Sequence, residues 1–201
     1  MPISETRRRL LTGLAAVTVL PLLPRPAAAM TQAQARALID QVMADVHAII
    51  NSGASESRMI DRFETLFGRY GDVPTIARSA LGPPARAASA AQLAAFTEAF
   101  SGYMARKYGR QFRRFVGATV QVNDAREVQR FWEVVSTMTL RGEPPFEVRW
   151  HVSDRSGQNR FFNLIIEGVN LLAAERQEIG TMLERRGGNL DRMTQDLRQA
   201  G

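Results

Sequence analysis

A change in the spacing of apolar residues divides the chain and limits the folds open to it. Between residues 120 and 166, apolar side chains tend to fall at every second position, in four runs that short turn sequences separate. The clearest turns are residues 142–145, GEPP, and residues 154–157, DRSG. Such alternation is typical of β-strands, and four strands joined by short turns favour an antiparallel meander. We expect strands within residues 120–122, 128–140, 147–153 and 161–166, the last covered on both faces because it is almost continuously apolar.

Helical spacing surrounds this block on both sides. Thr31 with Gln34 three residues later is a capping-box pattern, and apolar residues then recur every three or four positions as far as Ile50. Similar stripes predict further helices over residues 57–70, 75–81, 90–115, 171–186 and 190–197. The expected fold class is α+β, with a four-stranded antiparallel sheet packed against about six to seven helices.

The first 29 residues are typical of an export signal. Three arginines at positions 7–9 precede an apolar run over residues 10–23, and Ala27-Ala28-Ala29 provides a small-residue cleavage site. The run is shorter than the roughly 20 residues of a membrane span and contains Pro21, which leaves an uncleaved anchor as the weaker alternative. We expect a cleaved signal peptide over residues 1–29, one domain over residues 30–201, and a periplasmic location. The arginines fit a twin-arginine export route, and the general secretory route stays open.

The composition excludes several classes of function. The absence of cysteine rules out disulfides, thiolate metal ligands and cysteine nucleophiles, and two histidines cannot form a three-histidine zinc site. The chain carries 26 basic and 20 acidic residues; without residues 1–29 it carries 22 and 19, a net charge of +3. That small excess, with no nucleic-acid motif, argues against a nucleic-acid partner. Because no P-loop, G-x-S-x-G or G-x-G-x-x-G motif occurs, we expect no cofactor, no metal and no catalytic residue.

The two histidines are weak candidates for chemistry. His47 lies among the apolar residues of the first expected helix, where a structural role is the simpler interpretation. His151 lies on the polar side of its expected strand, and it is the best candidate for a general base if the domain encloses a cavity.

The end of the expected 90–115 helix is rich in positive charge. If the helix runs to residue 115, positions 106, 110, 113 and 114 share one face. Arginine can bind phosphate through two parallel hydrogen bonds, so this face suits lipid head groups or a docking partner, and a solvated face is the alternative. The candidate docking residues are Arg106, Lys107, Arg110, Arg113 and Arg114.

Three segments, in order, carry a resemblance to a known family. They are residues 72–82, DVPTIARSALG; residues 94–100, AAFTEAF, with Tyr103 and Tyr108 behind them; and residues 166–171, IEGVNL, followed by Arg176. With these segments the chain resembles the MlaC, or toluene-tolerance auxiliary, family of periplasmic phospholipid-binding proteins over residues 31–198. The chain departs from the family pattern in two segments. Residues 160–163, RFFN, stand where a tryptophan-lysine pair and then an aspartate are usual, with Asn163 in the place of the acid, and Asn170 stands where serine is usual.

The resemblance implies both an architecture and a function. The architecture is a curved antiparallel sheet with helices packed against it and a lipid-sized apolar pocket between them. The function is a non-enzymatic shuttle for phospholipid, or a related two-chain lipid. Its partners would be an outer-membrane lipoprotein complex and an inner-membrane complex of an MCE protein and an ABC transporter. Arginine-rich variants of the family include a hopanoid-biosynthesis-associated subgroup, so a hopanoid-linked carrier is an alternative.

The candidate pocket lining consists of large apolar residues at alternate positions of the strands, together with large apolar residues on the helices expected to face them. They are Phe67, Ile76, Leu81, Phe96, Phe100, Tyr103, Trp132, Val134, Met138, Val148, Trp150, Val152, Phe162, Leu164 and Ile166. Two functions of other classes stay open. One is a ligand-free periplasmic adaptor with a filled core. The other is an enzyme that resembles the cone-shaped nuclear-transport-factor-2 superfold, with His151 as its base.

Overall fold

The computed structural model describes residues 29–201, apart from the side chains of residues 112 and 113. Its helices are α1 (Gln32–Ile50), α2 (Glu56–Tyr70), α3 (Val73–Leu81), α4 (Ala90–Gly109), α5 (Leu171–Arg185) and α6 (Leu190–Leu197), with the 3-10 helices η1 (Pro83–Arg86) and η2 (Phe112–Phe115). Its strands are β1 (Thr119–Val128), β2 (Phe131–Thr139), β3 (Phe146–Ser153), β4 (Arg160–Ile166) and β5 (Val169–Asn170). The expected signal peptide falls on residues 1–29, and all but the last of these lie outside the described residues.

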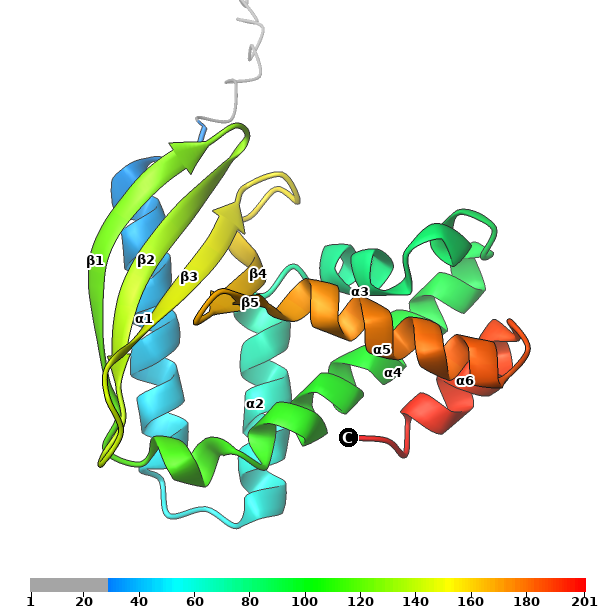
Figure 1. Cartoon of the computed structure of the whole chain (residues 1–201), viewed down its shortest axis with the longest axis horizontal. Coiled ribbons are helices and arrows are strands. Elements are labelled where there is room, and N and C mark those ends of the chain that lie inside the picture. The colour runs from blue at the N-terminus through cyan, green and yellow to red at the C-terminus, as the bar shows by residue number, and fades with distance from the viewer. Residues whose placement is uncertain (1–28) are drawn as a thin grey trace, which may run out of the picture.

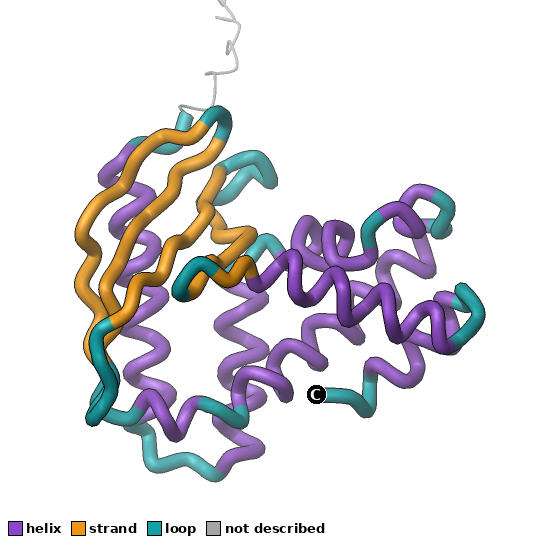
Figure 2. The backbone as a smooth tube through the Cα atoms, viewed as in Figure 1, coloured by secondary structure: helices purple, strands orange, loops and turns teal. Residues whose placement is uncertain are grey.

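The strands form one antiparallel sheet in chain order, from β1 at one edge to β5 at the other. The sheet is curved, and α1 runs along it and packs against β1, β2 and β3 (Figure 1). Helices α3 to α6 gather on the other side of the molecule, with α2 between the two groups (Figure 2). We call the sheet with α1 the sheet half and α3–α6 the helical half. The expected α+β class and the antiparallel meander are confirmed.

The expected number of strands is wrong by one. The sheet has five strands because β4 turns back at Glu167 and Gly168 to pair with the two residues of β5. Both turn residues have positive φ angles, 48° and 81°, which suits a two-residue hairpin turn. A two-residue strand is too short to show alternation, so its sequence gave no strand signal. A second tight turn, in which Gln129 has a φ of 55°, separates β1 from β2.

The fourth helix is shorter than expected. It ends at Gly109 rather than near residue 115, and η2 follows as a separate 3-10 helix. A Cβ at Gly109 would lie 3.1 Å from Cγ1 of Ile60, so glycine permits the close approach of α4 to α2. Its low helix propensity also favours an end there. Arg110, the C-cap, still follows Arg106 on this side of the helix, but η2 begins at Phe112, so Arg113 and Arg114 do not continue α4.

The first helix begins where the capping box predicts. The Thr31 hydroxyl accepts from the backbone N–H of Gln34, and the Gln34 side chain accepts from the backbone N–H of Thr31. From the same helix, Arg36 donates to the carbonyls of Val122 and Asn123, and Gln32 donates to that of Ala125. These bonds cover part of the free edge of β1, which would otherwise present unpaired backbone groups.

Candidate functional site

The sheet carries three cross-strand rows of mainly apolar side chains on one face. Val134, Trp150 and Leu164 lie opposite one another on β2, β3 and β4, with Trp132–Val152–Phe161 and Ser136–Val148–Ile166 on either side. Val134, Val148 and Val152 are almost completely buried, while Trp132, Leu164 and Ile166 are half-buried at the margins. Most of the strand residues predicted to line the pocket therefore share one mainly apolar face of the sheet. Met138 lies on the same parity, opposite Phe146.

A buried serine interrupts this apolar face without leaving a polar group unpaired. The Ser136 hydroxyl accepts from Nε1 of Trp150 at 3.0 Å and donates to the carbonyl of Val148 at 3.1 Å. The indole of Trp132 donates to the carbonyl of Met30, just before α1. Both tryptophans are thus fixed at their polar ends, which orients their apolar rings.

A row of aromatic rings leads from α2 to the centre of the sheet. Phe63 stacks on Phe67 at 6.3 Å between ring centroids, Phe67 lies 6.1 Å from Phe161, and Phe161 meets Trp150 edge-on at 5.8 Å. Phe63 is half-buried, and the other three rings are buried. The row joins α2, β4 and β3 through side chains that only pack, with no hydrogen bond between the rings.

Backbone contacts fix the position of this row. The turn between α2 and α3 forms a parallel bridge from Gly71 to Phe161, and the Asp72 N–H donates to the Phe161 carbonyl at 2.8 Å. Arg160 donates to the carbonyls of Gly68 and Gly71. A Cβ on Gly71 would lie 2.7 Å from the Phe67 carbonyl oxygen, so this turn requires glycine. The motif at residues 72–82 thus begins at the joint between helices and sheet.

The helical candidates divide into two groups. Phe67 meets the sheet through Phe161. Phe96, Phe100 and Tyr103 instead form a ring series along α4, at 5.8 and 6.2 Å, in a helix that packs on α2, α3 and α6. Ile76 and Leu81 are buried on α3, which packs on α4, α5 and β4. The α4 rings therefore lie in the core of the helical half.

One predicted strand residue lies on the other side of β4. The pairing of β3 with β4 shifts register between His151 and Val152, so Phe161 takes the place on the apolar face that alternation assigned to Phe162. Phe162 packs against Phe131 and His151 at 5.5 and 5.7 Å between centroids. The expectation that Phe162 shares a face of β4 with Leu164 and Ile166 is therefore wrong, because a β-bulge breaks the alternation.

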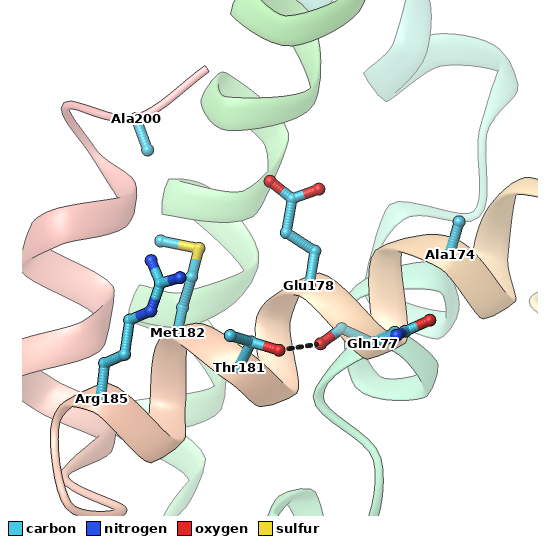
Figure 3. A pocket seen from close by; sticks show the side chains of 7 residues that line it. All are labelled: Ala174, Gln177, Glu178, Thr181, Met182, Arg185 and Ala200. Atoms are coloured by element: carbon cyan, nitrogen blue, oxygen red, sulfur yellow. Dashed lines mark hydrogen bonds between the residues drawn. The ribbon is translucent and has the colours of Figure 1, made fainter.

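The two hollows characterised in the structure do not coincide with the expected pocket. A hollow of about 550 Å³ is lined by one side of α5 and Ala200 (Figure 3). Its lining includes Gln177, Glu178, Thr181 and Arg185 as well as Met182. A second, of about 340 Å³, lies between α2 and α4 and is lined mainly by polar and charged side chains. Neither is an apolar space between sheet and helices, where the predicted residues instead pack on one another.

The basic residues at the end of α4 divide among several partners, although Arg106 and Arg110 border the same smaller hollow. Arg106 donates to the backbone carbonyls of Leu197 and Ala200, and Lys107 pairs with Glu175 and Glu178 on α5. Arg110 borders the smaller hollow, and Arg114 pairs with Glu143 in the β2–β3 turn at 3.3 Å. The side chain of Arg113 lies outside the described residues. The expected single face is wrong for Arg114, because α4 ends at Gly109 and Arg114 follows in η2.

Lys107 is the chain's only lysine and neutralises a buried acid. Its ammonium lies 2.7 Å from Oε1 of Glu175, whose side chain is 2% exposed, and Tyr108 donates to the same oxygen at 2.6 Å. Burial raises the pKa of Tyr103 and of Tyr108, and the Glu175 charge adds to both shifts. The hydrogen bond from Lys107 lowers the pKa of Glu178. This cluster joins α4 to α5 and accounts for two of the predicted docking and pocket residues, Lys107 and Tyr103.

The candidate base His151 lies on the opposite side of β3 from Trp150. Its Nε2 is 3.3 Å from Oε2 of Glu133, and its Nδ1 is 3.4 Å from the side-chain nitrogen of Asn163. Alternation along β3 separates this polar group from the apolar face. In the sequence, His151 is a candidate base and Asn163 is a departure from the family pattern, and only the strand register shows that the two side chains meet.

Within residues 29–201, no helix is long and apolar enough to cross a membrane. The same residues contain no group of three or more His, Asp or Glu side chains arranged to hold a metal ion.

Comparison with known proteins agrees with the fold and with the three sequence segments. Among solved structures, the fold is similar to that of a phospholipid-binding protein from Ralstonia solanacearum, which was determined in complex with a phospholipid. The TM-score is 0.69 at 19% sequence identity, over 81% of this chain and 98% of the other. Residues 37–199 match the family described as MlaC protein. Because this match spans most of the sequence, the chain belongs to the MlaC family.

Proposed function

We propose that the protein binds phospholipid in the periplasm, with its acyl chains inserted between the apolar face of the sheet and the helices. The observation that carries this proposal is the aromatic row from Phe63 to Trp150. It lies where two parts of the molecule meet through packed rings, and its outer ring reaches the half-buried margin. Family membership and the phospholipid complex of the similar Ralstonia protein support the same ligand class.

The acyl chains would first contact the strand residues of the apolar face. These are Trp132, Val134, Met138, Val148, Trp150, Val152, Leu164 and Ile166, with Phe67 facing them from α2. The helical residues Ile76, Leu81, Phe96, Phe100 and Tyr103 would extend the path if the chains reach the core of the helical half. Binding then requires the packed rings to separate, because the structure holds them in contact.

The energetics suit a carrier rather than a permanent store. Moving an acyl chain from water into an apolar site gains about 0.8 kcal/mol per methylene, or on the order of 20 kcal/mol for two long chains. A lipid taken from a bilayer has already left water, so the net transfer is near zero. The protein can therefore accept and release cargo without a chemical reaction, and we propose a non-enzymatic shuttle. Direction would come from an outer-membrane lipoprotein complex and an inner-membrane complex of an MCE protein and an ABC transporter.

The exposed basic residues are the remaining candidates for docking or for head-group contact. Arg110 and Arg114 keep exposed side chains, whereas Arg106 and Lys107 are held by α6 and α5. We propose that Arg110 and Arg114 supply this attraction, with Arg113 beside them in sequence. Reversal of both charges should weaken capture by the two membrane complexes, while Arg192→Glu on α6 should not. If the parent protein, the variant with both charges reversed and the Arg192→Glu control were captured equally, Arg110 and Arg114 would not be docking residues.

A vesicle experiment tests the lipid site directly. The mature protein is mixed with vesicles that contain labelled phosphatidylglycerol, the vesicles are pelleted, and lipid on the soluble protein is counted. Leu164→Asn places an amide on the apolar face, while Val169→Asn makes the same kind of change at a position that is 57% exposed on β5. We expect the Leu164 variant to take up at least tenfold less lipid, with the Val169 variant unchanged. Equal uptake by two folded variants would contradict the site, and no uptake by the parent protein would contradict the function.

A further inference from the structure

A row of polar side chains crosses four strands on the face opposite the apolar one. Arg126, Glu133, His151 and Asn163 lie directly opposite one another on β1, β2, β3 and β4. The row continues into α5, where the backbone N–H of Leu172 donates to Oδ1 of Asn163 at 3.3 Å. The row therefore connects the edge of the sheet to the first turn of a helix in the helical half.

Apolar rings shield the centre of this row. Phe131 lies 4.6 Å from the His151 ring and Phe162 lies 5.7 Å from it. The side chains of His151 and Glu133 are 14% and 9% exposed. Water therefore has little access to compensate for a hydrogen bond that is lost inside the row.

The hydrogen bonds fix the tautomer of His151. Asn163 uses its carbonyl oxygen to accept from Leu172, so its NH₂ group faces Nδ1 of His151. Nδ1 must then accept, which places the single ring proton on Nε2, where it is donated to Oε2 of Glu133. Glu133 is held in turn by Arg126, whose Nε and Nη2 lie 2.9 and 2.5 Å from Oε1.

A proton added to His151 is incompatible with only one hydrogen bond of the row, the one between Nδ1 and the NH₂ group of Asn163. Imidazolium donates from both nitrogens, and Nε2 keeps Glu133 as its acceptor. Nδ1–H would then face the NH₂ group of Asn163, two donors against each other. Rotation of the Asn163 amide by half a turn restores a bond to Nδ1–H but directs the NH₂ group at the Leu172 N–H. The Leu172 N–H then loses its acceptor.

Within residues 29–201, the charged groups around His151 that the structure describes give Nδ1 no other acceptor. Glu133 on β2 faces Nε2, and Arg126 on β1 acts on Glu133. On β3 itself, Arg149 pairs with Glu147. β4 contributes Asn163 and Phe162, and the first turn of α5 contributes the Leu172 amide.

We propose that His151 and Asn163 form a proton-operated latch at the first turn of α5. The bond from the Leu172 N–H to Asn163 on β4 is made when His151 is neutral and is lost when His151 is protonated, while α5 stays joined to β4 through β5. β4 also carries the tie from the α2–α3 turn, through Phe161. Loss of the Leu172–Asn163 bond therefore leaves one fewer connection between the sheet and the helical half. The consequence for cargo rests on the proposed function: lipid should leave the protein faster at acidic pH.

Amide hydrogen exchange tests the latch without any lipid. The protection factor of the Leu172 amide is measured at pH 5 and pH 8, on either side of the usual histidine range. The same NMR spectra record the titration of His151, which is simple to assign because the chain has two histidines. We expect protection to fall about tenfold on protonation, the factor that one lost hydrogen bond implies. Unchanged protection while His151 titrates would overturn the proposal.

Three variants separate the latch from a general effect of pH. In Asn163→Asp a carboxylate can accept from both Leu172 and protonated His151, so protection should stay high at both pH values. His151→Gln cannot titrate and should remove the pH response, whereas His47→Gln should keep it. A response that persists in both the Asn163 and the His151 variants would overturn the latch. Lipid release from vesicle-loaded protein is measured afterwards at both pH values. Equal release rates would contradict the link between the latch and the cargo, whereas protein that takes up no lipid would contradict the proposed function.

Discussion

The ring of Phe67 on α2 lies 6.1 Å from the ring of Phe161 on β4, and this contact is where the helices meet the apolar face of the sheet. The same β4 residue pairs through its backbone with Gly71 and Asp72. Packing and hydrogen bonding thus converge on one residue. Changes at this joint should affect stability and lipid uptake together, whereas changes on the exposed side of α2 should affect neither.

The turn glycine at this joint gives the first prediction. Gly71→Ala would place a Cβ 2.7 Å from the backbone oxygen of Phe67, so the turn must shift from its present position against β4. We expect the free energy of unfolding to fall by about 1–3 kcal/mol, as for other overpacked sites. Gly68→Ala is the control, since a Cβ there meets nothing within 4 Å and alanine favours a helix. Urea unfolding of both variants measures the difference, and equal stability would contradict the account of the turn.

The buried acid on α5 gives the second prediction. Lys107→Met would leave the Glu175 carboxylate without its cation, in a side chain that is 2% exposed. Breaking a buried ion pair from one side costs about 3–5 kcal/mol. The exposed partner is a matched control, because Glu178→Gln removes a pair whose acid is 49% exposed and should cost at most about 1 kcal/mol. Calorimetry would count against this ranking if the two variants melted alike.

The double variant Lys107→Met with Glu175→Gln refines that test. Replacing the carboxylate by an amide removes the uncompensated charge. We expect the double variant to be more stable than Lys107→Met alone. If it were less stable, the cost of the single change would have another origin, such as lost packing of the lysine stem.

The acid of the polar row predicts a pH dependence. Burial tends to raise the pKa of Glu133, but the hydrogen bonds from Arg126 and His151 outweigh it and the pKa is lowered. A lowered pKa in the folded state contributes stability that is present above the unfolded pKa and is lost as pH falls through the folded value. The free energy of unfolding of Glu133→Gln should therefore be lower than that of the parent protein at pH 7. Between pH 7 and pH 3 it should fall by less than that of the parent protein. Urea midpoints from pH 7 to pH 3 decide this, and parallel curves would contradict it.

The C-terminus depends on one arginine. Arg106 donates to the carbonyls of Leu197 and Ala200, each at 2.8 Å, and so covers the end of α6. Arg106→Met should make the last turn accessible to carboxypeptidase, whereas Arg110→Met should leave its rate of digestion unchanged. Mass spectrometry of the digest gives the result directly. Equal rates for the two variants would remove this role from Arg106.

Much of the fold could be predicted because its signals are local. The capping box at Thr31 marks the start of α1, and alternation from Phe131 to Ser153 identifies the two central strands. The errors arose where a distant contact decides the local structure. The end of α4 depends on how closely Gly109 approaches Ile60.

The candidate site was harder to predict than the fold. Alternation placed Trp150 and Leu164 on one face, and the strand register confirms it. The same rule failed for Phe162 because a bulge places Phe161, and not Phe162, on the apolar face. The strand contains no glycine or other residue that would predict a bulge from the sequence. The row from Arg126 to Asn163 needs the register of three strand pairs at once, which the sequence does not contain.

The most direct test of the proposed function is native mass spectrometry of the mature protein taken from the periplasm, with lipid extraction of the same sample. We expect a single species whose mass exceeds that of the protein by the mass of one two-chain phospholipid, and we expect the extract to contain that phospholipid. A polycyclic triterpenoid in the extract would contradict the phospholipid assignment and favour the hopanoid-linked carrier. Protein that carries no lipid, and that takes none from vesicles, would contradict the central claim.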